Sequence, residues 1–109
     1  MIFFKSIYIL LFFQILSCSN LYDAIDLFID GEIALINGEE ELALKKMNQA
    51  LKVYPNSATI HSNIGFLLQN QNDYLSALKS YKQSFYLDNK SYEIGLLIYK
   101  LYKEIGQLE

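Results

Sequence analysis

A spacing of about 34 residues recurs along the sequence and constrains the fold more than any other feature. Each 34-residue unit contains two stretches with apolar residues at every third or fourth position, the spacing typical of amphipathic helices, and polar turns separate them. Units of this length fold as hairpins of helices that stack on one another. Residues 34 apart occupy equivalent positions of successive units, as Gly31 and Gly65, Gly38 and Asn72, and Ala43 and Ala77 do.

The central unit, residues 58–91, shows the pattern most clearly. Ile60, Ile64 and Leu67 recur at steps of three and four, so they lie on one face of a helix. The polar run 70–73 then supplies a turn and the start of a second helix. Gly65 lies inside the first helix, where glycine costs about 1 kcal/mol relative to alanine. We therefore expect a close approach of the two helices at Gly65.

These residues resemble the tetratricopeptide repeat, whose pattern begins with Trp, two residues, Leu-Gly, two residues and Tyr. The matching residues are His61, Ile64, Gly65 and Leu68 in the central unit, and Leu27, Asp30, Gly31 and Ala34 in the first. The resemblance implies an all-α fold of antiparallel helix–turn–helix repeats, stacked as a short right-handed solenoid of about five helices. The domain would cover residues 24–109, with repeats at 24–57 and 58–91 and a partial third at 92–109. The sequence departs from the pattern at Asp30, where Leu is usual, and at Asn89, where the family has proline.

The resemblance also implies a binding surface, because in this family the first helices of successive repeats line a concave groove that holds partner peptides. Transferred position by position, the groove residues would be Phe28, Glu32, Leu35, Ser62, Phe66, Gln69, Leu96, Lys100 and Lys103. A well-known site of the family grips the C-terminal carboxylate of chaperones with Lys and Asn on these helices. Here Asn63 is the one match, and Glu32 and Glu93 carry the wrong charge. We therefore do not expect binding of chaperone tails.

Residues 1–17 are almost entirely apolar, with Lys5 as their one charge. The run is short for a membrane-spanning helix and matches the hydrophobic region of a secretion signal. Its end, residues 15–18, reads Ile-Leu-Ser-Cys and resembles a bacterial lipobox. That resemblance implies a signal peptide at 1–17, a lipidated Cys18 followed by a short linker (18–23), and a membrane-anchored lipoprotein of the bacterial cell envelope that faces the periplasm or the exterior. An uncleaved anchor helix and an ordinary cleaved signal are the alternatives.

The last predicted helix, residues 92–108, is apolar around most of its circumference. A terminal helix of a solenoid usually has a polar outer face, because nothing buries it. If this helix opens an incomplete third repeat, we expect Ile98, Leu101 and Tyr102 to lie in water. That face would then serve in assembly, for example as a homodimer.

Composition narrows the function further. The chain has 109 residues, 9 basic and 12 acidic side chains, one His and one Cys. An acidic chain without a basic stripe does not suit nucleic acid. A single Cys18 cannot form an internal disulfide, and His61 lacks partners for catalysis or metal binding, so we expect no enzyme, metal or cofactor. The predicted function is a membrane-tethered protein-interaction module, an adaptor or scaffold; the alternative is a structural subunit that self-associates through its C-terminal helix.

The lipobox resemblance predicts that Cys18 carries lipid. Cells that express the chain and are fed labelled fatty acid should yield a labelled, processed protein. The Cys18→Ala variant should accumulate as an unlabelled precursor, because the acyl acceptor is gone. A wild-type protein without label would replace the lipoprotein interpretation with the anchor helix or the ordinary signal.

Overall fold

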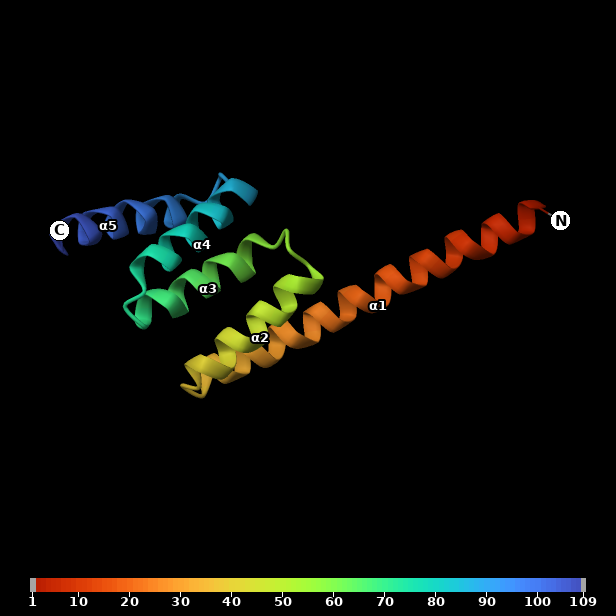
Figure 1. The fold of residues 1–109 in the computed structure, drawn as a ribbon, viewed down its shortest axis with the longest axis horizontal. Coiled ribbons are helices and arrows are strands. Elements are labelled where there is room, and N and C mark those ends of the chain that lie inside the picture. The colour runs from red at the N-terminus through yellow and green to blue at the C-terminus, as the bar shows by residue number, and fades with distance from the viewer. Residues whose placement is uncertain (1, 109) are drawn as a thin grey trace.

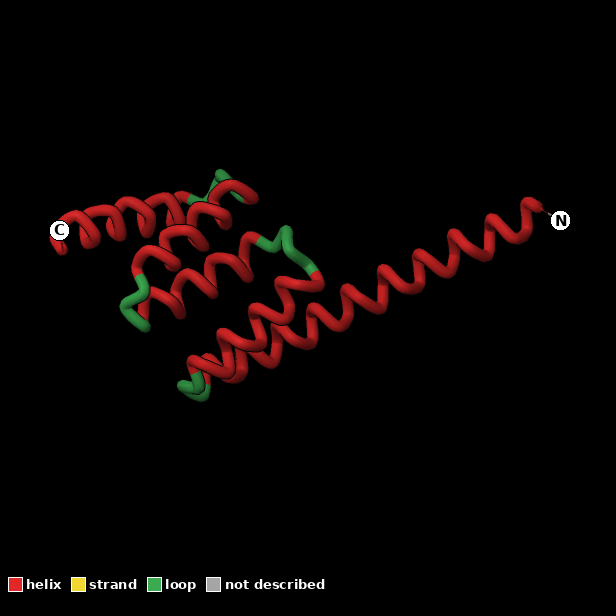
Figure 2. The backbone as a smooth tube through the Cα atoms, in the orientation of Figure 1, coloured by secondary structure: helices red, strands yellow, loops and turns green. Residues whose placement is uncertain are grey.

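A computed structural model describes residues 2–108 and contains five α-helices, with no β-strand in that range, so the all-α prediction is confirmed. Helices α1 and α2 form one antiparallel hairpin, α3 and α4 form a second, and α5 packs against α4 (Figures 1 and 2). The N-terminal half of α1 projects from this body, and the molecule measures 68 × 30 × 21 Å. The helices span Ile2–Ile36 (α1), Glu40–Val53 (α2), Ala58–Asn70 (α3), Tyr74–Leu87 (α4) and Tyr92–Leu108 (α5).

The turns inside the two hairpins have the same geometry at matching positions of the repeat. Gly38 (φ 78°) and Asn72 (φ 61°) both adopt the left-handed conformation, which glycine and asparagine tolerate best. After each, a backbone N–H reaches back into the preceding helix: Glu39 N donates to Ala34 O, and Asp73 N donates to Leu68 O, both at 2.9 Å. These bonds satisfy carbonyls that a helix end would leave unpaired.

Helix starts are fixed by side chains that the sequence places there. The Ser57 hydroxyl accepts a hydrogen bond from Ile60 N at 3.2 Å, and the Asp73 carboxylate accepts one from Ser76 N at 3.3 Å. Such caps stabilise a helix by about 1 kcal/mol. Pro55 ends the preceding helix, since it forces Tyr54 out of the helical region.

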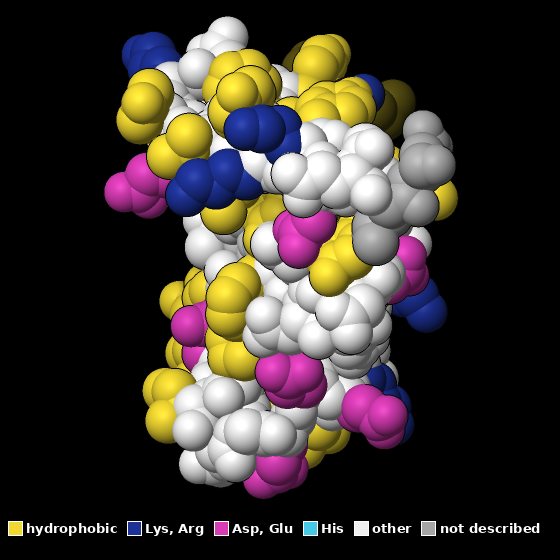
Figure 3. All heavy atoms as spheres, turned by 90° about the vertical axis from the view of Figure 1, so that its left-hand side faces the viewer, with side chains coloured by type: hydrophobic (Ala, Val, Ile, Leu, Met, Phe, Trp, Pro, Cys, Tyr) yellow, Lys and Arg dark blue, Asp and Glu magenta, His cyan; other side chains and the backbone are white. Residues whose placement is uncertain are grey.

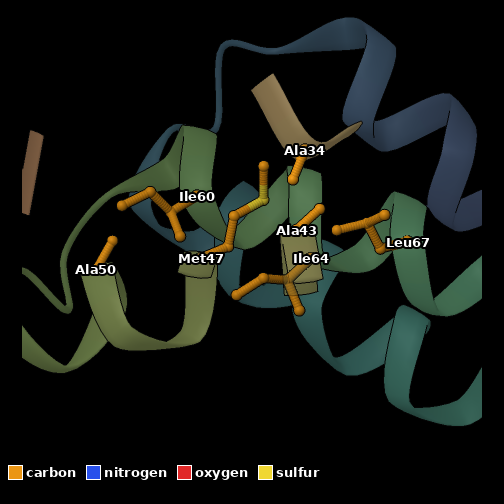
Figure 4. Packing of buried hydrophobic residues seen from close by; sticks show 7 residues of the cluster. All are labelled: Ala34, Ala43, Met47, Ala50, Ile60, Ile64 and Leu67. Carbon is orange, nitrogen blue, oxygen red and sulfur yellow. The ribbon is translucent and has the colours of Figure 1, made fainter. Parts of the chain in front are cut away.

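Two clusters of buried side chains form the core. The first joins three helices, with Ala34 from α1, Met47 from α2 and Ile64 from α3 pointing toward one another (Figure 4). The second joins α4 to α5 through Tyr81 and Leu101. Leu68 packs against both clusters, so the repeats share one continuous core. The complete first cluster is Ala34, Ala43, Met47, Ala50, Ile60, Ile64 and Leu67.

The close helix approach expected at Gly65 is present. A Cβ atom at Gly65 would lie 2.8 Å from the ring of Tyr81, closer than side-chain carbons come. At Gly31, the matching residue of the first repeat, a Cβ would lie 3.0 Å from Met47 Cγ. Met47 and Tyr81 also occupy matching positions one repeat apart, so the same contact holds each hairpin together.

Helix α1 is longer than the sequence indicated. The first repeat was predicted to begin at Ala24 after a linker at residues 18–23, but the helix runs unbroken from Ile2 to Ile36. Serine within this segment does not break the helix: Ser19 Oγ donates to Leu16 O at 2.8 Å instead of competing for the turn. Every residue from 2 to 23 is exposed.

The expectation that Ile98 and Leu101 lie in water is wrong. Leu101 is fully buried, and Ile98 packs beside it against α4. Their counterparts one repeat earlier, Ile64 and Leu67, pack against α1 and α2. This face of a first helix therefore contacts the preceding repeat and needs no following helix. Tyr102 is half exposed, as predicted.

The face of α5 that would meet a following helix carries Tyr99, at the position of Gly31 and Gly65. Tyr99 is exposed, and the ammonium of Lys103 lies 5.7 Å from its ring centroid. A helix packed on α5 as α4 packs on α3 would meet this ring in place of a glycine. Position 99 therefore lacks the glycine contact that joins the two helices of each hairpin.

The two glycine environments predict opposite effects of adding a methyl group. Gly65→Ala should lower the melting temperature, because the new Cβ meets Tyr81 at 2.8 Å. Gly95→Ala should raise it, because the nearest side-chain atom is at 3.6 Å and alanine is favoured over glycine in a helix by about 1 kcal/mol. Thermal unfolding followed by circular dichroism measures both. Equal shifts would contradict the packing described for Gly65.

Candidate protein-binding face

The residues predicted to bind a partner lie on the three first helices, α1, α3 and α5. Phe66 on α3 and Leu96 on α5 are the apolar members that reach solvent, with 47% and 38% of their surface exposed. Lys100 and Lys103, one and two turns further along α5, are also exposed. We call this surface, from α1 across α3 to α5, the first-helix face.

A hydrogen bond joins the first two repeats across this face. Asn63 Nδ2 donates to Glu32 Oε1 at 2.6 Å, and both residues are half-buried. Bonds to a charged acceptor are short and strong, so this pair fixes α3 against α1. The pair also occupies the Asn63 amide, the one residue that matched the family's carboxylate site.

Two further predicted residues are held by hydrogen bonds. The Tyr81 hydroxyl donates to Gln69 Oε1 at 3.0 Å, and Ser62 Oγ donates to Thr59 O within its own helix at 2.9 Å. Burial raises the pKa of Tyr81, because a phenolate would lose its hydration inside the core. Gln69 therefore links the face to the buried contact at Gly65, while Ser62 makes only a local bond.

Phe28 and Leu35 are half-buried and pack against the first core cluster, so they form the floor of the face. Phe28 also lines an apolar pocket of about 240 Å³ at the end of the domain where α1 enters. This pocket could not be expected from the sequence, because it depends on the α2–α3 loop meeting α1. Its other lining residues are Leu21, Ala24, Ile25, Tyr54, Ser57, Thr59 and Ile60.

A trough of about 500 Å³, which was not predicted from the sequence, lies between α2 and α4, with α3 as its floor. Leu44 and Leu51 form one wall, and their spacing of two helical turns beside the buried stripe of α2 was the available signal. His61 lies in this trough, half-buried. Its Nε2 is 3.0 Å from Pro55 O, so the imidazole donates and holds the α2–α3 loop.

Chemical groups for catalysis are sparse on these surfaces. Among residues 2–108, no group of three or more His, Cys, Asp or Glu side chains is placed to hold a metal ion. Every buried side-chain polar atom in the described part of the chain has a hydrogen-bond partner. The arrangement offers apolar contact, hydrogen bonds and charge, which are the means of binding a polypeptide.

The buried phenol makes stability depend on pH. The folded state holds the Tyr81 proton more tightly than the unfolded state, so its contribution is complete below about pH 10 and is lost as the pH rises through the raised pKa. Tyr81→Phe should destabilise the domain near neutral pH by about 0.5–1.5 kcal/mol, the worth of a typical hydrogen bond. Urea unfolding measures the free energy of unfolding of both proteins. The difference between Tyr81→Phe and wild type should shrink once the pH exceeds the raised pKa of Tyr81. Tyr86→Phe, at an exposed site, is the control; a constant difference would contradict a neutral buried Tyr81.

Comparison with known proteins supports the repeat fold. No protein-family model matches the chain, and no curated protein matches it significantly. Among solved structures, the TPR domain of Arabidopsis OM64 has a TM-score of 0.74 at 15% identity and covers 81% of this chain and 73% of that one. The second TPR domain of Spaghetti (RPAP3), solved with the HSP90 peptide SRMEEVD, has a TM-score of 0.74 at 19% identity and covers 83% of each chain. The chain therefore has the fold of a tetratricopeptide-repeat domain.

Proposed function

We propose that the chain is a membrane-tethered protein-interaction module that binds a peptide or helix across its first-helix face. The fold supports this function, since tetratricopeptide domains serve to bind proteins and one structural neighbour was solved with a peptide bound. The observation that carries the proposal is the exposure of Phe66 and Leu96 on adjacent first helices. A contiguous apolar patch on a protein surface usually marks an interaction site, and successive repeats of a solenoid build the extended surfaces that bind partners.

The chemistry of the face describes the partner. Apolar side chains fit Phe66 and Leu96, and a carboxylate fits Lys100 and Lys103 at the α5 end. The α1 end is different, because Glu32 is acidic and accepts its hydrogen bond from Asn63. This engaged amide supports the expectation that a carboxylate clamp for chaperone tails is absent.

Helix α1 supports the membrane tether. Of the described helices, α1 alone is long and apolar enough to cross a membrane, and a secretion signal has the same length and composition. Cys18 is exposed on this helix, one turn before Leu21 and Tyr22, where the body of the domain begins. A lipid on Cys18 and a retained anchor helix would both hold the domain in the cell envelope by its first repeat.

A photo-crosslinking residue can test the binding face. Placed at Phe66 in cells, it should capture a discrete protein partner. Placed at Leu75, which is 71% exposed on α4 but lies off the first-helix face, it should not capture that partner. Leu96→Glu should reduce capture from position 66, because a buried carboxylate disfavours an apolar contact. Equal capture from positions 66 and 75 would contradict the proposal.

Self-association through α5 is the alternative function. In the structure, α5 exposes less apolar surface for such an interface than the sequence indicated. Leu101 is buried within the chain, and the Lys82 ammonium donates to the Tyr102 hydroxyl at 3.2 Å. Sedimentation of the purified domain measures the assembly state directly.

A further inference from the structure

The repeat domain has two distinct ends, because its helices run antiparallel. The turns at residues 37–39 and 71–73 lie together at one end, which we call the far end. The loops at residues 54–57 and 88–91 lie at the opposite end, on the side from which α1 projects (Figures 1 and 2). We call this the near end. Any tether through residues 2–18 is attached on that side.

The near end is rich in exposed tyrosine. Tyr86 at the end of α4 is 82% exposed, Tyr92 at the start of α5 is 80% exposed, and Tyr54 precedes Pro55 in the α2–α3 loop. Tyr22 is exposed on α1 just before the first repeat. Tyrosine has an apolar ring and a polar hydroxyl, and it is enriched where proteins meet the headgroup region of a membrane.

The apolar pocket shows that the near end of the domain lies directly beside α1. Leu21 and Ile25 of α1 line this pocket together with Tyr54 of the α2–α3 loop. The loop therefore lies beside the turn of α1 that follows Cys18, and no spacer separates the loop from the tether. A domain held by residues 2–18 brings this loop to the membrane surface.

The far end has a different character. The acidic run Glu39–Glu41 and Asp73 lie at its turns, and acidic side chains are spread over the side facing away from the projecting helix, with lysine and apolar side chains gathered over its upper part (Figure 3). At the near end, Lys52 and Lys90 are outnumbered by exposed acidic side chains, which are Asp23, Asp26, Asp88 and Glu93. The near end thus combines tyrosine rings with a small negative net charge, a surface suited to neutral rather than anionic phospholipid headgroups.

From these observations we propose that the near end of the domain rests on the headgroup layer of a bilayer, through Tyr54, Tyr86 and Tyr92. This inference rests on the proposed membrane tether and adds an orientation to it. The helices then stand steeply on the membrane, and the first-helix face opens sideways, along the membrane surface. The same orientation follows whether residues 2–17 stay in the bilayer or lipid on Cys18 replaces them, because both attach at this end.

Tryptophan substitutions can measure the orientation, since the chain has no native tryptophan. The full chain carrying one substitution is reconstituted in phosphatidylcholine vesicles, with or without brominated acyl chains that quench nearby indoles. Tyr92→Trp at the start of α5 and Tyr102→Trp further along the same helix form a matched pair, and Tyr86→Trp and Leu75→Trp form a second pair on α4. Positions 92 and 86 should lose most of their emission to the brominated lipid and shift to the blue. Positions 102 and 75 should keep their emission.

The outcomes separate the orientation from the tether. Flotation of the protein with the vesicles reports the tether; a chain that does not float overturns both ideas. A chain that floats but shows equal quenching at both members of each pair, or none at any position, overturns the orientation alone. Crosslinking from Phe66 reports the binding function independently of both. Thermal melting of each variant confirms that it is folded. If one variant does not fold, the other matched pair still tests the orientation.

Discussion

The packing of both hairpins depends on a glycine in the first helix, at the point where the second helix contacts it. Gly65 lets the ring of Tyr81 lie against the backbone of α3, and Gly31 does the same for Met47. The helices of a hairpin can then approach closely enough to bury the alanines on either side. The Tyr81 hydroxyl continues past the glycine to Gln69 on the first-helix face. The contact at Gly65 therefore links the packing of the core to the first-helix face.

One position of the repeat has a different environment in the first helix than in the later ones. Ile64 in α3 and Ile98 in α5 pack against the preceding repeat, whereas the matching residue in α1 is Asp30, whose carboxylate lies 3.1 Å from the ammonium of Lys46. An exposed ion pair of this kind contributes little stability, but it keeps both charged groups in contact with water, where an isoleucine would expose apolar surface. Asp30, which departed from the family pattern, is thus consistent with the outward side of a first helix.

Local chemistry made most of the fold predictable: the 34-residue period indicated the hairpins, and residues such as Gly38 and Ser57 marked where helices end and begin. The sequence could not show which neighbour an apolar residue meets, so Leu101 was assigned to a missing helix. The continuity of α1 was also missed, because polar residues in an exposed helix look the same as a linker. The predicted binding residues do lie on the first helices, but the bond between Glu32 and Asn63 depends on rotamers and on helix spacing.

The unbroken backbone of α1 has a mechanical consequence. A flexible linker would let a tethered domain sweep a volume that grows with linker length, and so search for distant partners. A continuous helix has a fixed rise for each residue and bends only gently, so it allows no such reach. Since Ile2–Ile36 is one helix, torque or tilt applied to its apolar half is transmitted directly to the hairpin that contains Gly31. Under the proposed tether, with residues 2–17 retained as the anchor, such a domain would sample few orientations, and a partner would have to diffuse to it.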